Sequence, residues 1–475
     1  MSLATFMTYL DNNVINVALP TIQRSLHLSV AGLEWVVSGY VLVFAGLMLV
    51  GGRLADVYGR RRLFLVGLSV FTLSSLAAGL AGSGAELIAF RAVQGLGAAL
   101  LVPTTLAIII ATFDDIKERT QAIGLWTAIG ALALAFGPLI GGFISQHFHW
   151  GWIFFINVPV GVVTFAMAVA WMAESHGRTS SRRLDVPGLA SSAVAMFSLT
   201  YALIEGLDRG WTSAPILGAF ALAAAAAAAF LAVEARAAHP MVQVSLFRNR
   251  VFSGGTSVIM LWAFGIFGIY FFTSLYLQGI LGFSPVKAGL AFVPMALFVV
   301  IFAGLAGPVA ARLGAHRTVA LGLAVMVGGL VLFLGQGLHV TYLDLMPGFV
   351  LFGAGSGLMN APLSNLVLDS MPTDRSGVAS ALMNASREVA GLLGITVIGA
   401  VLRSRQGGAL RHGTAPAQAF LDGYHAGLTV TIALTAAGIV VALITLRRVS
   451  RPAARLVTAP AADGADRKAG TVATG

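Results

Sequence analysis

Apolar stretches separated by short polar loops recur along the whole 475-residue chain. Each is about 20 residues long, enough for a helix to cross a hydrocarbon core of roughly 30 Å. The pattern predicts fourteen membrane-spanning helices, at residues 2–22, 33–52, 63–82, 86–112, 120–145, 152–173, 186–206, 214–234, 251–278, 286–310, 318–336, 343–369, 378–402 and 425–446. We therefore expect an all-α polytopic membrane protein.

The composition agrees with this pattern. Hydrophobic residues make up 57% of the chain and charged residues 10%, whereas a soluble domain is about a quarter charged. A soluble fold is excluded. There is no cysteine, which rules out disulfides, thiolate metal sites and thiol catalysis.

The basic residues are dispersed over the inter-helix loops, so the formal charge of +10 indicates topology and not nucleic-acid binding. With a cytoplasmic N-terminus, 21 of the 29 lysines and arginines fall in cytoplasmic loops and the tail. Six fall on the outer side: Arg24, Arg209, Lys287, Arg403, Arg405 and Arg411. This bias satisfies the positive-inside rule. We expect both termini in the cytoplasm and the first helix retained in a cell (plasma) membrane. Few lysines and abundant alanine and glycine are typical of a GC-rich bacterial source.

Two pairs of motifs suggest an internal duplication. Residues 52–62 (GRLADVYGRRR) have a degenerate echo 255 residues later at 307–317, and Pro103 is matched by Pro362 at an offset of 259. Either match alone can arise by chance, but the similar offsets favour two homologous halves, a common basis of alternating access. The offset spans eight helices, so spans 7 and 8 form an insertion between two pseudo-symmetric six-helix bundles. The expected domains are 1–175 and 246–450, an inserted pair at 176–245, and a flexible cytoplasmic tail at 451–475.

Five motifs carry a family resemblance. They are 10–20 (LDNNVINVALP) in the first span, 52–61 (GRLADVYGRR) after the second, 91–95 (RAVQG) in the fourth, 137–142 (GPLIGG) in the fifth and 152–161 (WIFFINVPVG) in the sixth. In this order and topology, the chain resembles the major facilitator superfamily over residues 10–446, specifically its fourteen-helix drug:proton antiporter branch. The resemblance implies proton-coupled efflux of small lipophilic drugs, antibiotics or biocides by alternating access.

Two charged residues lie inside predicted spans and are candidates for proton coupling. An ionised carboxylate at Asp11, near the middle of a helix, is costly and suits a proton carrier, although it could instead order helix packing. Arg91 lies five residues into its span and must face water or an anion, so Asp11 is its expected partner; the alternative is a snorkelling structural residue. Glu388, next to Arg387 in span 13, is a candidate second proton or cation site, or one half of a structural ion pair.

The remaining candidates come from turns and cavity faces. The resemblance implies a conformational latch at Gly52, Asp56, Gly59, Arg60 and Arg61, with a simple positive-inside anchor as the alternative. Gly137, Pro138, Gly141 and Gly142 predict an antiporter hinge or a close packing face. Candidate cavity-lining residues, as opposed to core or lipid-facing ones, are Asn12, Asn16, Tyr40, Gln94, Trp126, Phe136, Asn157 and Tyr276.

Enzymatic functions find little support. The sequence has no Gly-Lys-Ser/Thr phosphate loop, His-Glu-x-x-His helix or Gly-x-Ser-x-Gly elbow. We expect no enzyme activity, cofactor or metal. The expected partners are a lipophilic small molecule, protons and the lipid bilayer, with the monomer as the functional form. A nutrient or metabolite transporter, proton-coupled or facilitated, is the main alternative, and a non-transporting membrane sensor is a second.

Overall fold

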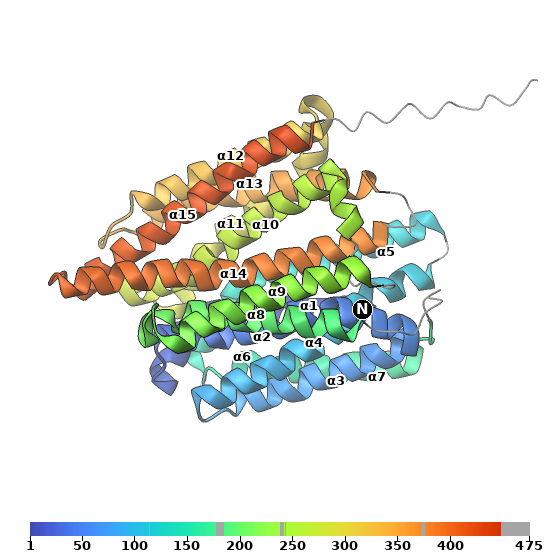
Figure 1. Cartoon of the computed structure of the whole chain (residues 1–475), viewed down its shortest axis with the longest axis horizontal. Coiled ribbons are helices and arrows are strands. Elements are labelled where there is room, and N and C mark those ends of the chain that lie inside the picture. The colour runs from blue at the N-terminus through green and yellow to red at the C-terminus, as the bar shows by residue number, and fades with distance from the viewer. Residues whose placement is uncertain (114, 177–184, 238–241, 243, 372–375, 448–475) are drawn as a thin grey trace, which may run out of the picture.

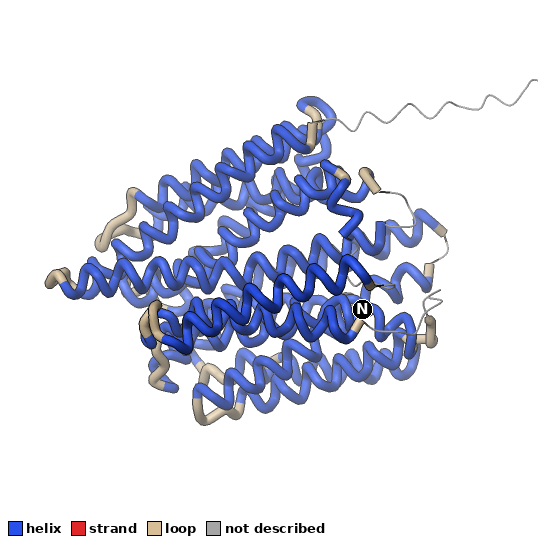
Figure 2. The backbone as a smooth tube through the Cα atoms, in the orientation of Figure 1, coloured by secondary structure: helices blue, strands red, loops and turns tan. Residues whose placement is uncertain are grey.

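The computed structural model describes residues 1–113, 115–176, 185–237, 242, 244–371 and 376–447. Within these ranges the chain is helical and contains no strand (Figure 2). Its elements are α1 (Ser2–Leu26), α2 (Val30–Tyr58), α3 (Arg60–Gly79), α4 (Gly84–Thr112), α5 (Ile116–His147), α6 (Trp152–Phe155), α7 (Asn157–Trp171), α8 (Val186–Arg209), α9 (Ala214–Arg236), η1 (Val244–Arg248), α10 (Arg250–Leu275), η2 (Tyr276–Ile280), α11 (Pro285–Leu313), α12 (Ala315–Leu334), α13 (Tyr342–Asp369), α14 (Ser376–Arg411) and α15 (Pro416–Thr445).

Twelve helical segments of the described chain are long and apolar enough to cross a membrane. One of them, Trp152–Trp171, combines α6 and α7, and another, Arg250–Ile280, combines α10 and η2. The two remaining predicted spans are α1 and α5, with 25 and 32 residues. Helix α1 is the more polar of the two, because it carries Asp11 and three asparagines, whereas α5 begins with charged residues and continues as an apolar stretch. The predicted all-α polytopic fold is confirmed.

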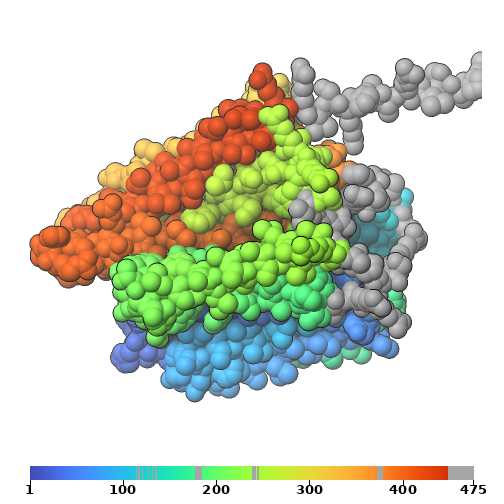
Figure 3. All heavy atoms as spheres, in the orientation of Figure 1, coloured from blue at the N-terminus to red at the C-terminus, as the bar shows by residue number. Residues whose placement is uncertain are grey.

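The helices form two groups with a helix pair beside them. Helices α1–α7 pack mainly on one another, and so do α10–α15 (blue to cyan and yellow-green to red in Figure 1). The inserted helices α8 and α9 pair with each other, and α8 also contacts α2 and α14, one from each group. In the face seen in Figure 3, these two helices form a green layer over the region where the groups meet.

Two glycines at equivalent places support the internal repeat. Gly59 precedes α3 with φ 108°, and Gly314 precedes α12 with φ 87°. Both helices have 20 residues. A positive φ is strained for any residue with a Cβ atom, so the same sharp turn uses glycine in both halves.

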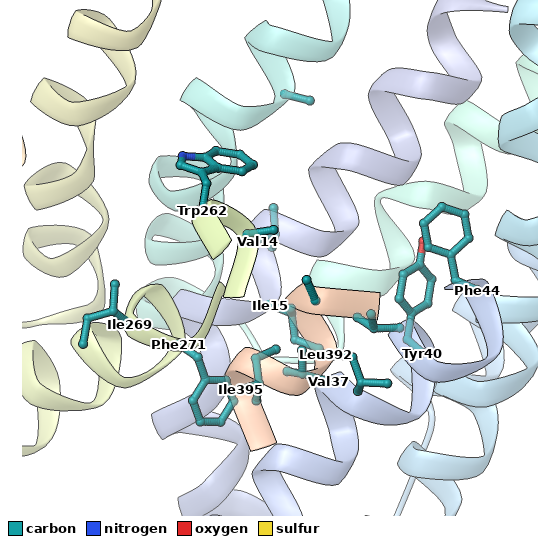
Figure 4. Packing of buried hydrophobic residues seen from close by; sticks show 14 of the residues in the cluster. Val14, Ile15, Val37, Tyr40, Phe44, Trp262, Ile269, Phe271, Leu392 and Ile395 are labelled. Carbon is teal, nitrogen blue, oxygen red and sulfur yellow. The ribbon is translucent and has the colours of Figure 1, made fainter. Parts of the chain in front are cut away.

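The two groups are in contact at the end of the molecule opposite Gly59, which we call the sealed end. There α5 packs against α11 so closely that a Cβ atom on Gly142 would collide with the Pro285 carbonyl. At the same end, the Gln278 side chain donates a hydrogen bond to the Val17 carbonyl at 2.8 Å. Deeper in the molecule, buried apolar residues of α1, α2, α10 and α14 make up one packing cluster, part of which is drawn in Figure 4.

One sequence expectation is wrong. Residues 403–424 were expected to form an outer loop, but α14 continues to Arg411 and α15 begins at Pro416. Arg403 is buried within α14, where its guanidinium lies 3.3 Å from the Glu34 carboxylate of α2. This opposite charge makes a buried arginine tolerable, and hydropathy does not reveal it. The predicted tail, 451–475, lies outside the described residues.

Candidate functional site

The structure brings Asp11 of α1 and Arg91 of α4 into direct contact. Arg91 Nη1 lies 2.5 Å from Asp11 Oδ2, and the two residues are 0% and 2% exposed. Beside the pair, α4 packs tightly on α2, where a Cβ atom on Gly95 would collide with the Tyr40 carbonyl. A buried charge pair of this kind is favourable only when further hydrogen bonds satisfy its remaining polar atoms.

Side-chain amides supply most of those hydrogen bonds, and Arg91 Nη2 is left without a partner among the described residues. Asp11 Oδ1 accepts from Gln94 Nε2 at 2.9 Å and from Asn157 Nδ2 at 2.8 Å. Both amides also donate to the hydroxyl of Ser75, and the Gln94 oxygen accepts from Arg91 at 2.6 Å. Every group bonded to Asp11 is therefore a donor, an arrangement that suits a carboxylate. We call these five residues the polar cluster: Asp11, Ser75, Arg91, Gln94 and Asn157.

Tyr40 of α2 connects the polar cluster to a cavity. The guanidinium carbon of Arg91 lies 4.3 Å from the centre of the Tyr40 ring, within cation–π range. Tyr40 also lines a cavity of about 500 Å³, whereas Asp11 and Arg91 are not among its lining residues. A molecule in the cavity would therefore contact Tyr40 and not the acid itself.

The cavity lies between the two helix groups and reaches the Gly59 end of the molecule. Its inner wall includes Tyr9, Asn12 and Trp126, and its lining extends to Asp56 and Arg60 beside Gly59. Aromatic rings and amides of this kind suit an amphipathic organic molecule. The two ends of the molecule therefore differ: the cavity approaches the Gly59 end, whereas the helix groups are in contact at the sealed end.

A second acid, Glu388 of α14, also lines the cavity. Its carboxylate accepts two hydrogen bonds from the adjacent Arg387, at 2.7 and 3.2 Å. The Glu388 side chain is 6% exposed and that of Arg387 is 25% exposed. The pair thus presents its basic partner more openly than its acid.

The predicted latch residues form a compact turn between α2 and α3. Arg60 pairs with Asp56 at 2.8 Å and also donates to the carbonyl of Ala107 in α4. Glu174, which follows α7, accepts from the backbone N–H groups of Arg61 and Arg62 at 2.9 and 3.2 Å. The carboxylate thereby caps the N-terminus of α3, where the helix dipole favours negative charge. Gly52, in α2, lines the cavity.

The Gly-Pro motif of α5 lies against two neighbouring helices. Added Cβ atoms would collide with α1 at Gly137 and Gly141 and with α11 at Gly142. The carbonyl of Pro138 in turn faces Gly289 of α11. The small residues therefore allow backbone contact at the sealed end, and α5 runs through Pro138 as one helix.

The predicted cavity residues separate into three groups. Asn12, Tyr40 and Trp126 line the cavity, and Gln94 and Asn157 instead bind Asp11. The others lie elsewhere: Asn16 bonds the Asn12 carbonyl, Phe136 is 46% exposed, and Tyr276 is buried and stacked on Tyr424. Periodicity gives the face of a helix but not which neighbour covers it.

Two acids were missed. Glu34 lies just inside the second predicted span, where an acid is itself a signal, and it is fully buried. Glu174 directly follows the sixth span, a place from which it can cap a neighbouring helix. The sequence offers no direct sign of the partner of either acid, because each partner is far away in the chain.

The sequence profile described as Major Facilitator Superfamily matches residues 1–395. The chain belongs to this superfamily. Among curated relatives, Multidrug resistance protein Stp of Mycobacterium tuberculosis (strain CDC 1551 / Oshkosh) is 37% identical over 400 residues, covering 84% of this chain and 74% of Stp. The Tetracenomycin C resistance and export protein of Streptomyces glaucescens is 34% identical over 411 residues, covering 86% of this chain and 76% of the relative.

Solved transporter structures share the fold. The POT family transporter PepTSo has a TM-score of 0.67 at 16% identity, covering 92% of this chain and 97% of that one. A bacterial homologue of the lysosomal transporter Spinster has a TM-score of 0.65 at 17% identity, covering 94% and 95%. With its apolar helices, the chain is a multi-pass membrane protein of a transporter family.

Proposed function

We propose that this chain is a proton-coupled antiporter that exports small lipophilic molecules by alternating access. The observation that carries the proposal is the buried Asp11–Arg91 pair, separated by Tyr40 from a cavity that approaches only the Gly59 end among the described residues. Relatives named for multidrug resistance and for antibiotic resistance and export support the direction of transport.

The proposed orientation places the Gly59 end in the cytoplasm. The arginine-rich turn at residues 60–62 lies there, and the positive-inside rule favours that assignment. The N-terminus lies at the same end, because α1 reaches the sealed end through its later residue Val17. A cytoplasmic cavity can collect substrate from the cell interior or the inner leaflet of the plasma membrane.

The mechanism follows from the polar cluster. In the structure Asp11 is held by three donors, so uptake of a proton must weaken at least one of these bonds. Release of Arg91 would change its contact with Tyr40 and so alter the wall of the cavity. Asp11 would take up a proton when the sealed end is open and release it toward the cytoplasm, and substrate would occupy the cavity in the unprotonated state.

The proposed roles of the other residues are structural or selective. The turn at Asp56 and Arg60 acts as a latch between the α2–α3 end and α4. The glycines of α5 allow the sealed end to close. Glu388 acts as a recognition site for monocationic substrates, which would have to displace Arg387 from its carboxylate. The two helix groups move as units that carry the latch and the cavity walls with them.

The test is transport by the full chain in proteoliposomes under an imposed pH gradient. The compounds should be neutral, monocationic and anionic aromatics, with ethidium as the monocation. We expect the pH gradient to drive substrate transport in the direction opposite to proton movement. Proton movement should in turn depend on the presence of substrate. Transport that ignores the gradient would contradict antiport and favour a facilitator.

A further inference from the structure

A second buried ion pair lies at the sealed end, away from the polar cluster. Arg403 Nη2 of α14 lies 3.3 Å from Glu34 Oε2 of α2, and the two residues are 6% and 0% exposed. Each helix group contributes one member. The pair therefore crosses the plane along which the groups must separate if this end is to open.

The inserted helix α8 completes the contact. Arg403 Nη2 donates to the carbonyls of Ile204 and Leu203, at 2.9 and 3.4 Å. On the other side, the indole of Trp35, next to Glu34, donates to Glu205 of α8 at 3.0 Å. One turn of α8 thus contacts both sides of the ion pair. It binds Arg403 directly, and it binds α2, the helix of Glu34, through Trp35.

Other charges and the local backbone fit this arrangement. Glu205 is paired with Arg209 at 3.2 Å, and Asp208 of α8 lies close enough to act electrostatically on Glu34. Gly399, one turn before Arg403, faces the carboxylate, and a Cβ atom there would collide with Glu34 Oε1. Because Gly399 has no side chain, the carboxylate of Glu34 has room next to α14.

The pair is only partly satisfied in the sealed state. Both Glu34 carboxylate oxygens, and Nε and Nη1 of Arg403, lack a hydrogen-bond partner among the described residues. Desolvated charges with free hydrogen-bonding capacity gain from hydration, whereas removing one partner leaves an uncompensated buried charge. Such a pair can hold a closed interface and still separate when water enters.

We propose that Glu34 and Arg403 are positioning residues that lock the sealed end, and that α8 is the third component of this lock. The inserted helix pair then belongs to the gate and is more than a lipid-facing addition. Opening of this end breaks the Glu34–Arg403 contact and hydrates both side chains. This inference rests on the alternating access of the proposed function but not on proton coupling or on the identity of the substrate.

The chain itself provides the assay, because it has no cysteine. Ser38 is fully buried on α2, one turn from Glu34 and on the same face, so a Ser38→Cys thiol reports opening of the sealed end. Ser380 lines the cavity, so Ser380→Cys reports access from the Gly59 end. Both reporters are labelled with a water-soluble maleimide in purified full-length protein, without substrate or a pH gradient.

In these backgrounds Glu34→Gln and Arg403→Gln remove one charge each. We expect Ser38→Cys to react about tenfold faster or more, because the remaining charge is uncompensated in the sealed state, and Ser380→Cys to react more slowly. The exchange Glu34→Arg with Arg403→Glu should restore the original pattern only in part, because a carboxylate at position 403 cannot donate to the α8 carbonyls that Arg403 binds. Gly399→Ala, which keeps both charges but displaces the carboxylate, should also speed labelling of Ser38→Cys.

Asp422→Asn, a neutralised acid at an exposed position of α15, is the matched control and should change neither rate. Unchanged labelling in Glu34→Gln and Gly399→Ala, with a normal elution profile in detergent, would overturn the lock. If instead labelling changes as expected but no gradient-driven transport is found, the lock stands and the proposed proton coupling fails. The two claims are thereby tested separately.

Discussion

Arg91 stacks on the ring of Tyr40 while its guanidinium holds the carboxylate of Asp11. The same tyrosine lines the cavity. In the proposed mechanism this one aromatic side chain links a change of charge at Asp11 to a change of shape in the cavity, without any substrate contact to the acid.

This relationship predicts the effect of changes at Tyr40. Tyr40→Phe keeps the ring over Arg91 and should retain most proton-coupled transport. Tyr40→Ala removes the barrier between cavity water and the polar cluster, so we expect protons to leak without substrate. The measurement is the number of protons moved per substrate in proteoliposomes. Equal coupling in the alanine variant and the unaltered protein would contradict a coupling role for the ring.

Arg91→Met should destabilise the protein by about 3–5 kcal/mol, because it leaves the Asp11 carboxylate buried and unpaired. The double variant Asp11→Asn with Arg91→Met removes that charge and should recover a large part of the loss. Thermal unfolding in detergent compares the four proteins of this cycle. If the two losses simply add, Asp11 and Arg91 are energetically independent.

The turn before α3 provides a comparison between the two halves. Gly59→Ala and Gly314→Ala both place a side chain at positive φ, at a cost of about 1–3 kcal/mol. At Gly59 the new methyl group would also displace Glu174, whose carboxylate lies 2.7 Å from the position of an added Cβ. At Gly314 the nearest atom is 3.5 Å away.

We therefore expect Gly59→Ala to be the less stable of the two and to slow transport more strongly. Thermal unfolding and initial transport rates measure the difference. Similar values for both variants would show that the Glu174 cap contributes little to the latch.

The cavity acid gives a prediction about selectivity. Glu388→Gln should lower transport of ethidium by several-fold and leave a neutral aromatic compound nearly unchanged, because only the cation gains from the carboxylate. The exposed Asp422→Asn is again the control. If transport of both compounds falls equally, Glu388 acts in the transport cycle and not in recognition of the cation.

Much of the fold could be predicted from the sequence, because crossing a bilayer imposes a length and a composition on each helix. The polar cluster could be predicted in part for the same reason, because Asp11 and Arg91 stand out as charges in apolar spans. The amide partners of Asp11 were harder to predict: Gln94 and Asn157 were expected in a cavity wall and instead bind Asp11.

The sealed end shows why other contacts could not be predicted from the sequence. Arg403 ends an apolar stretch, so hydropathy alone places it in a loop. Its burial depends on Glu34 and on two carbonyls of α8, which lie 369 and about 200 residues away in the chain. Charge compensation between distant helices is a tertiary property, and no local pattern in a single sequence encodes it.

The most direct test of the account compares two modes of transport in Asp11→Asn. An asparagine keeps the size of the side chain but cannot cycle a proton, so we predict loss of uphill transport driven by a pH gradient. Substrate exchange across the membrane at equal pH should persist, because the cavity and both gates remain. Uphill transport at the unaltered rate in Asp11→Asn would contradict the central role of Asp11.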